Sequence, residues 1–253
     1  MLRLLCVTAH PDDEASSFGG TLLLCHERGI QTRIICLTEG RAATHRGGAA
    51  NGEELGAMRR REFAAACKVL NTEGEVLNYA DSALEREDFY AVVGDLTRRI
   101  RQFRPHVVAT YGPDGSVTAH TDHGMASLFT SAAYQAVARP KRYPEHLTDG
   151  LEPWQPQKLY YSTTNFLMKG RPPVSLAPST CAVEIGHERL ARKIEAFKQH
   201  TTQAPLFELF ESNVRPRGTK ELFHLAAAIT PRRITIEEDL FEGVVDNIEQ
   251  IQN

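Results

Sequence analysis

Four ionisable side chains crowd into five residues near the N-terminus, in the segment His-Pro-Asp-Asp-Glu at residues 10–14. This segment directly follows an apolar run, residues 4–8, that has the length and composition of a buried strand. Clustered carboxylates repel one another unless a group of opposite charge lies between them. Imidazole and carboxylate together are the ligands of catalytic zinc, which takes three protein ligands and leaves one position for water. The segment therefore predicts a metal site at the end of a strand.

A second segment can complete such a site. His120 and His123 lie in the sequence His-Thr-Asp-His, which follows the apolar residues 106–111 and a loop rich in Gly and Pro. His10 and an aspartate would supply two ligands, and a histidine of this second segment would supply the third. Adjacent residues usually point apart, so one of Asp12 and Asp13 is expected at the metal and the other near the water. The residues alone do not decide which.

The elements that must position these segments alternate along the chain. The sequence predicts strands at residues 2–8, 31–37, 76–79, 106–111, 158–162, 181–185 and 234–236, and helices at residues 16–28, 53–70, 89–103, 122–137, 188–200, 222–229 and 237–250. Residues 38–52, 139–157, 168–178 and 204–218 have no clear period. The alternation predicts an α/β fold, a Rossmann-like doubly wound and mostly parallel sheet flanked by helices. Ligands bind such sheets beyond the carboxyl ends of the strands, where both charged segments lie.

Length and composition limit the kind of protein. The 253 residues suit a single domain, with a core of about residues 1–205 and a C-terminal extension of about residues 206–253. The net charge of −3 provides no basic surface for nucleic acid, and no apolar stretch reaches the 20 or so residues of a membrane span. Five scattered cysteines indicate reduced core residues rather than a disulfide framework. We therefore expect a cytoplasmic protein with a small-molecule partner, and a homo-oligomer remains open.

The first segment also argues against a nucleotide cofactor. A dinucleotide-binding domain carries Gly-x-Gly-x-x-Gly after its first strand, because the phosphates approach the backbone closely there. This chain has three carboxylates at that place, and they would repel a pyrophosphate. The same charges attract a cation.

In its His-Pro-Asp-Asp-Glu segment and its later His-x-x-His, the chain resembles the PIG-L/LmbE-like family of zinc-dependent N-deacetylases. The resemblance runs from the N-terminus to about residue 205. It implies that His10, Asp13 and His123 bind Zn²⁺, for which Fe²⁺ could substitute, and that Asp12 takes a proton from the attacking water. Two departures are visible: Thr121 replaces a proline that the family usually has, and residues 117–119 lack an aromatic hydroxyl that some relatives carry.

Further roles follow from the chemistry and from the resemblance. His120 is the candidate for stabilising the oxyanion, and either Asp12 or His120 could protonate the leaving amine. The resemblance implies that Asp122 holds His120 in the right tautomer and keeps it charged, although a helix N-cap explains Asp122 equally well. Glu14 is expected to orient the loop rather than to bind the metal.

The resemblance also makes Arg59 and Asp81 substrate-binding residues, with Glu62 as the companion of Arg59. His200 and Gln203 fall in a late segment that it matches, where packing and hydrogen bonding are the expected roles.

These residues predict a hydrolase that removes an acetyl or other acyl group from the nitrogen of an N-acetylglucosamine-like amino sugar. The substrate class comes from the resemblance alone. Two alternatives remain: an amidase of the same scaffold that acts on another N-acyl compound or a thiol conjugate, and a binding module without catalysis. Asp12 and His120 argue against the module, because binding a metal requires neither.

Overall fold

The computed structural model describes residues 1–163, 176–216, 218–230 and 235–247. Five parallel strands form most of one sheet: β1 (Arg3–Thr8), β2 (Gln31–Thr38), β3 (Glu73–Tyr79), β4 (Val107–Tyr111) and β5 (Lys158–Ser162). Two more strands, β6 (Cys181–Glu184) and β7 (Lys220–Ala228), complete the order β3-β2-β1-β4-β5-β7-β6. The predicted doubly wound, mostly parallel sheet is confirmed.

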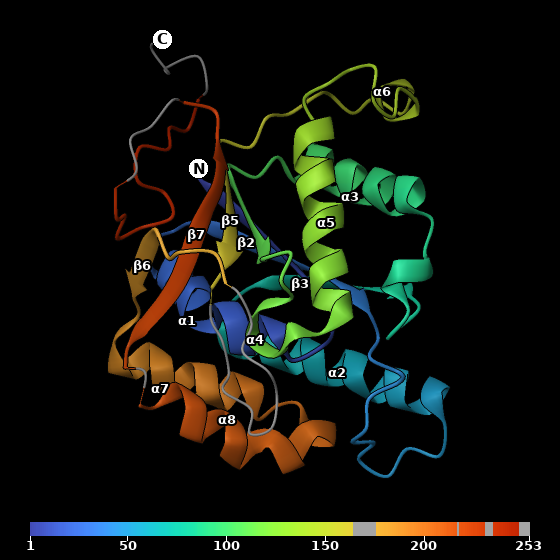
Figure 1. Ribbon diagram of the computed structural model, residues 1–253, viewed down its shortest axis with the longest axis vertical. Coiled ribbons are helices and arrows are strands. Elements are labelled where there is room, and N and C mark those ends of the chain that lie inside the picture. The colour runs from blue at the N-terminus through green and yellow to red at the C-terminus, as the bar shows by residue number, and fades with distance from the viewer. Residues whose placement is uncertain (164–175, 217, 231–234, 248–253) are drawn as a thin grey trace.

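Helices cover both faces of this sheet (Figure 1). The longer helices are α1 (Asp13–Glu27), α2 (Gly52–Leu70), α3 (Phe89–Phe103), α5 (Thr121–Ala136), α7 (Gly186–Phe197) and α8 (Phe207–Val214). Short turns of helix lie at α4 (Ser116–Ala119), α6 (Glu145–Thr148), η1 (Leu84–Arg86) and η2 (Thr201–Leu206). The cores on the two faces are separate: Cys6 of β1 packs with α1, α2 and α7, whereas its neighbour Val7 packs with α3 and α5. This alternation along a strand buried on both sides is typical of parallel sheets.

The C-terminal part of the chain differs from the sequence prediction. Residues 222–229 were expected to be helical, but they belong to β7, which pairs antiparallel with both β5 and β6. Residues 237–247, expected to begin a helix, form turns and one isolated bridge to β6. Helix α8 lies where no period was visible. Part of the predicted extension thus supplies a strand to the interior of the sheet.

Two other predictions fall partly outside the described residues. The predicted loop at residues 168–178 is described only from residue 176, and the predicted strand at residues 234–236 only from residue 235, where no strand is present. Within the described ranges, none of the helices has both the length and the apolar composition needed to cross a bilayer.

The connections from strands β1 and β4 meet at one edge of the sheet. β1 lies between β2 and β4, and the chain leaves β1 and β4 in the same direction because the two strands are parallel. The segment of residues 10–14 leaves the end of β1, and residues 112–123 leave the end of β4. The fold therefore brings the two charged segments together, as the sequence predicts.

Candidate metal centre

Helix α1 begins inside the first charged segment, three residues earlier than expected. Asp13 and Glu14 form its first turn, where carboxylates are favoured by the helix dipole. Asp12 precedes the helix in a left-handed backbone conformation, with φ of 118°, which costs free energy in a residue other than glycine. Its backbone N–H donates to Glu14 Oε2 at 2.9 Å, and His200 Nε2 donates to Glu14 Oε1 at 2.6 Å. Glu14 therefore orients the loop rather than joining the ligand cluster.

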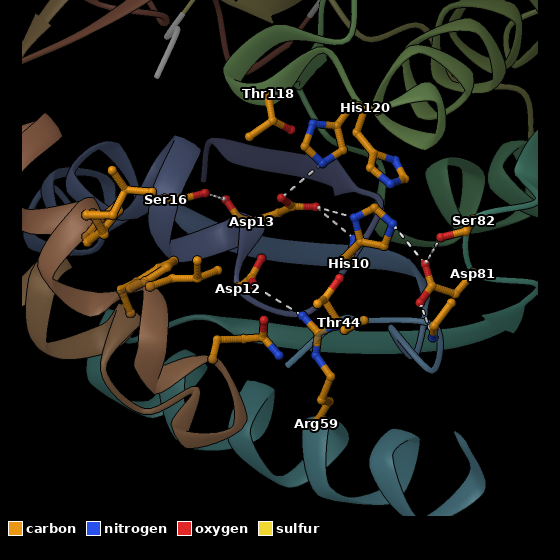
Figure 2. Close-up of a pocket in the computed structure, with 18 of the residues that line it drawn as sticks. His10, Asp12, Asp13, Ser16, Thr44, Arg59, Asp81, Ser82, Thr118 and His120 are labelled. Carbon is orange, nitrogen blue, oxygen red and sulfur yellow. Dashed lines mark hydrogen bonds and ion pairs between the residues drawn. The ribbon is translucent and has the colours of Figure 1, made fainter. Parts of the chain in front are cut away.

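Three side chains from the two segments meet over one point. Asp13 Oδ2 lies 3.6 Å from His10 Nδ1, and Asp13 Oδ1 lies 3.2 Å from His123 Nε2. One ligand atom from each residue can be chosen so that all three lie within 4.8 Å of one another. Figure 2 shows Asp13 and His10 turned towards one another. The sequence-predicted ligands His10, Asp13 and His123 are thus neighbours.

The outer partners of these histidines fix which ring nitrogen faces Asp13. His10 Nε2 donates to Asp122 Oδ2 at 3.2 Å and contacts Asp81 Oδ1 at 3.1 Å. His123 Nδ1 donates to the carbonyl of Gly115 at 3.2 Å, and its ring stacks on Tyr111. Each histidine therefore uses one nitrogen as a donor to the protein and directs the other towards Asp13. Histidine ligands of metal ions almost always have such a partner on the second nitrogen.

The charges of the cluster also fit a cation. Burial lowers the pKa of His10, but hydrogen bonds to carboxylates outweigh this effect and raise the pKa well above its usual range. Burial alone would raise the pKa of Asp13, yet the neighbouring histidines hold it well below its usual range. The carboxylates thus draw positive charge to this point, and a metal ion would supply it. The residues present therefore fit a divalent ion with two nitrogen ligands and one oxygen ligand.

His120 and Asp122 stand beside this cluster in an arrangement that the sequence did not predict. His120 is the N-cap of α5, and its Nδ1 accepts the backbone N–H of Asp122 at 3.1 Å. The Asp122 carboxylate instead binds His10 and accepts the backbone N–H groups of Ser82 and Leu84. The expectations that Asp122 caps the helix, or orients His120 through its carboxylate, are therefore corrected. His10, His120 and Asp122 also lie close enough to form a second group of ligand type.

The protonation of His120 follows from its surroundings. Burial and the nearby rings of His10 and His123 lower its pKa below the usual value. Because Nδ1 accepts the N–H of Asp122, the proton of the neutral ring lies on Nε2. His120 is thus a neutral donor that lines the pocket, and the expectation that Asp122 keeps it charged is wrong.

Asp12 lies below the cluster and is held by Arg59 of α2. Burial is the main cause that raises the pKa of Asp12, to about 6, although the Arg59 charge opposes it. Arg59 Nη2 donates to Asp12 Oδ2 at 3.1 Å and Nη1 to the carbonyl of Gly40 at 3.0 Å. Gly40 has φ of 67°, and a Cβ there would clash with the guanidinium. The buried Arg59 therefore positions the Asp12 loop.

Asp81 approaches the cluster from the end of β3. Its Oδ2 accepts the N–H of Ala42 at 2.6 Å, and its Oδ1 contacts His10. Burial would raise the pKa of Asp81, but the contact with His10 outweighs this and lowers it to about 2. Asp81 and Ser82 lie on one side of His10, whereas Asp13 and Ser16 lie on the other (Figure 2). Of the predicted catalytic, metal-binding and substrate-binding residues, all except Asp122 line one pocket of about 330 Å³.

Sequence reasoning missed several of these contacts. The Gly115 carbonyl and the Ser82 and Leu84 amides are backbone groups, which leave no signal in residue types. Glu62, expected beside Arg59, instead accepts the Thr202 backbone N–H and the hydroxyls of Thr201 and Thr202. The bond from His200 to Glu14 joins residues 186 positions apart. Only the resemblance in the late segment pointed to His200.

Comparison with known proteins assigns the family. Residues 5–134, more than half of the chain, match the family described as PIG-L: GlcNAc-PI de-N-acetylase. The chain belongs to the PIG-L family. The resemblance seen in two short segments is thereby confirmed.

Relatives within this family match nearly the whole chain. The mycothiol S-conjugate amidase of Streptomyces coelicolor is 27% identical over 97% of this chain and 98% of its own. The 1D-myo-inositol 2-acetamido-2-deoxy-alpha-D-glucopyranoside deacetylase of Rhodococcus erythropolis is 30% identical over 89% of this chain and 91% of its own. Among solved structures, the N,N'-diacetylchitobiose deacetylase from Pyrococcus horikoshii superposes with a TM-score of 0.73 at 22% identity, covering 90% and 86% of the two chains. This last likeness concerns the fold.

Proposed function

We propose that this PIG-L family chain is a metal-dependent hydrolase that removes the acyl group from the nitrogen of an amino sugar. The observation that carries the proposal is the meeting of His10, Asp13 and His123 at the floor of a pocket that also holds Asp12 and His120. Relatives named as a deacetylase and an amidase, each matched over most of its length, support hydrolysis of an amide.

In this proposal His10, Asp13 and His123 hold the metal, for which Zn²⁺ is the first candidate and Fe²⁺ the second. Bound there, the ion would lower the pKa of a water from about 15.7 to about 7 and polarise the substrate carbonyl. Asp122 and Gly115 act on the outer side of the ligands, because each binds the second nitrogen of a histidine. Their role is to fix ring orientation.

Asp12 is the proposed general base. Its carboxylate lines the pocket beside the ligand Asp13, and Arg59 holds one carboxylate oxygen in place. A positioned carboxylate can accept the proton of the attacking water and return it to the leaving amine. The positive φ of Asp12 supports this role, because strained backbone is retained where a side chain must point in one direction.

His120 is the proposed donor to the oxyanion. The proton on Nε2 of its neutral ring can hydrogen-bond an oxygen that gains charge as the carbonyl is attacked. To protonate the leaving amine, His120 would first have to take up a second proton, because a neutral ring that gave up its Nε2 proton would become an imidazolate. A protonated His120 and Asp12 remain rivals for that step. Arg59 and Asp81 also line the pocket and are the proposed substrate-binding residues, although both also hold the loops around the metal.

The test is release of free amine by metal-reconstituted protein. The panel contains N-acetylglucosamine, its glycosides and a cysteinyl amide of glucosamine. We expect turnover of at least one N-acyl amino sugar, and an Asp12→Asn variant should lose about 10²–10⁴-fold in kcat while retaining its metal. Asn also tolerates the left-handed backbone at this position, so the fold should be preserved.

The control variant is Asp149→Asn, which changes an exposed aspartate paired with Arg98 and far from the pocket lining. It should match the unmodified protein in metal content and kcat. Metal-loaded protein that hydrolyses none of these amides would refute the proposed function. Turnover of the cysteinyl amide alone would favour the amidase instead.

A further inference from the structure

The pocket around the candidate metal centre has two chemically different sides. On one side lie Asp81 and Ser82, which offer a carboxylate and a hydroxyl group, and Thr44 lies between them and Asp12 in the view of Figure 2. On the other side, past Asp13 and Ser16, the lining comes from η2 and α8. The chain thus separates a polar side from a second side built by its C-terminal part.

Three side chains of this second side are apolar. Leu206, Leu209 and Phe210 line the pocket there, and Phe210 stacks on Phe197 with ring centroids 3.9 Å apart. Leu209 remains 40% exposed. An exposed leucine is common on protein surfaces, but one that joins other apolar side chains in a binding pocket indicates a ligand that covers it. We call Leu206, Leu209 and Phe210 the apolar wall.

Polar groups beside the apolar wall are engaged within the protein. Asn213 Nδ2 donates to the carbonyl of Leu209, and Gln203 Nε2 donates to the carbonyl of His45. The Ser16 hydroxyl donates to the carbonyl of Asp13. The bonds hold these side chains in place but leave acceptor oxygens and one N–H of Asn213 for a ligand. The preference for an apolar substituent therefore rests on the apolar wall itself and not on its polar neighbours.

The two sides assign an orientation to the amide of the substrate. An amino sugar carries hydroxyl groups on the nitrogen side of its amide. These suit Asp81, whose carboxylate keeps lone pairs beyond its contacts with Ala42 and His10, and the neighbouring Ser82. The alkyl chain of the acyl group extends from the carbonyl carbon in the opposite direction, towards the apolar wall. This assignment rests on the proposed function, since it takes the candidate metal centre as the place where the carbonyl reacts.

We propose that the substrate carries an aliphatic acyl chain longer than acetyl, and that the apolar wall selects it. Water adds its oxygen to the acyl carbon, the C–N bond breaks, and the amine takes the proton. The products are a fatty acid and a free amino sugar, so no oxidant or reductant takes part. Leu209 is the specificity-determining residue of this wall, because it is the most exposed of the three.

The test compares kcat/KM for N-acetyl-, N-butanoyl-, N-hexanoyl- and N-octanoylglucosamine on the metal-loaded protein. Each methylene buried against the wall should raise kcat/KM by about fourfold, which corresponds to about 0.8 kcal/mol. The series should therefore rise with chain length until the wall is covered. Octyl N-acetylglucosaminide places the same chain on the sugar side and should gain little over N-acetylglucosamine.

Leu209→Asn should reduce the ratio of kcat/KM for the hexanoyl compound to kcat/KM for the acetyl compound by about tenfold or more. Leu128→Asn is the matched control, because Leu128 is a helical leucine with 46% exposure that does not line the pocket. It should keep the ratio of the unmodified protein. Metal content checks that both variants remain intact.

The outcomes separate this inference from the proposed function. Hydrolysis of the acetyl compound with falling kcat/KM for longer acyl chains would overturn the acyl-chain inference and leave the deacylase proposal standing. Preference for the octyl glycoside, or a Leu209→Asn ratio equal to that of Leu128→Asn, would also overturn it. Failure to hydrolyse any of the compounds would count against the proposed function itself.

Discussion

Two histidines at opposite ends of the neighbouring strands β1 and β4 show how differently one sheet can use the same side chain. His10 follows the carboxyl end of β1 and touches three carboxylates. His106 precedes β4, where its Nδ1 accepts the N–H of Arg3 at 3.2 Å and its Nε2 donates to the carbonyl of Asp246 at 3.1 Å. Both rings are largely buried.

The pKa values of His10 and His106 are shifted in opposite directions. Carboxylates raise the pKa of His10 despite its burial, whereas burial lowers the pKa of His106 and keeps it neutral. The bonds of His106 are complete in one tautomer, so this end of the sheet needs no further partner. The bonds of His10 leave excess negative charge around the ring. A buried histidine therefore indicates a functional site when its neighbours still require a cation, and a structural one when they do not.

Asp13→Asn, at the His10 end of the sheet, is expected to have the largest effect, and this effect should fall on metal affinity. Asparagine keeps the shape and can still accept the backbone N–H of His10, but it removes the charge between the two histidines. We expect metal affinity to fall by more than the roughly 10–100-fold that loss of an outer partner costs, and turnover to fall with it. Elemental analysis after dialysis measures the metal. A variant with unaltered metal content would show that the ligand set is wrong.

His106→Ala is expected to have an intermediate effect, and this effect should fall on stability rather than on metal affinity. It removes a buried ring and leaves the N–H of half-buried Arg3 and the carbonyl of exposed Asp246 to water, so the free energy of unfolding should fall by about 1–3 kcal/mol. Urea unfolding of the metal-free protein measures this change. Metal affinity and kcat should stay as in the unmodified protein. A loss of metal in His106→Ala would break the separation between the two ends.

The smallest effect is a pH dependence of stability. The folded state holds the pKa of His106 below the usual value of about 6.5, so the unfolded chain binds the proton first as the pH falls. The contribution of His106 is therefore complete above pH 6.5 and is lost progressively below it. His106→Gln, which can keep one acceptor and one donor but does not titrate, should show a smaller loss of stability between pH 7 and pH 5.5. Equal losses in both proteins would contradict a neutral His106.

The sequence was most informative where the signal is local. Residues 10–14 and 120–123 carry their chemistry in adjacent positions, and the strands before them are short apolar runs. Strand β7 was mistaken for a helix because residues 225–228 read Leu-Ala-Ala-Ala, a good helix-forming run, and pairing with β5 and β6 overrides that preference.

The site was predicted by residue type but not by contact. The resemblance implied that Asp122 holds His120, yet helix α5 turns its carboxylate towards His10 and the Ser82 amide. No pattern in the chain indicates which way a first-turn side chain points. The apolar wall was missed for a related reason: α8 is only eight residues long, too short for a clear period.

The bond between His200 and Glu14 has a consequence for partial unfolding. Residues that bind the metal in our proposal all come from the first half of the chain, but the peptide of Asp12 is held by Glu14, and Glu14 by a histidine from the second half. A local opening that lifts η2 and α8 away would remove that support first. The ion would stay in place while Asp12 relaxed, so hydrogen exchange in η2 and α8 should report how often the protein rests in a metal-loaded but inert form.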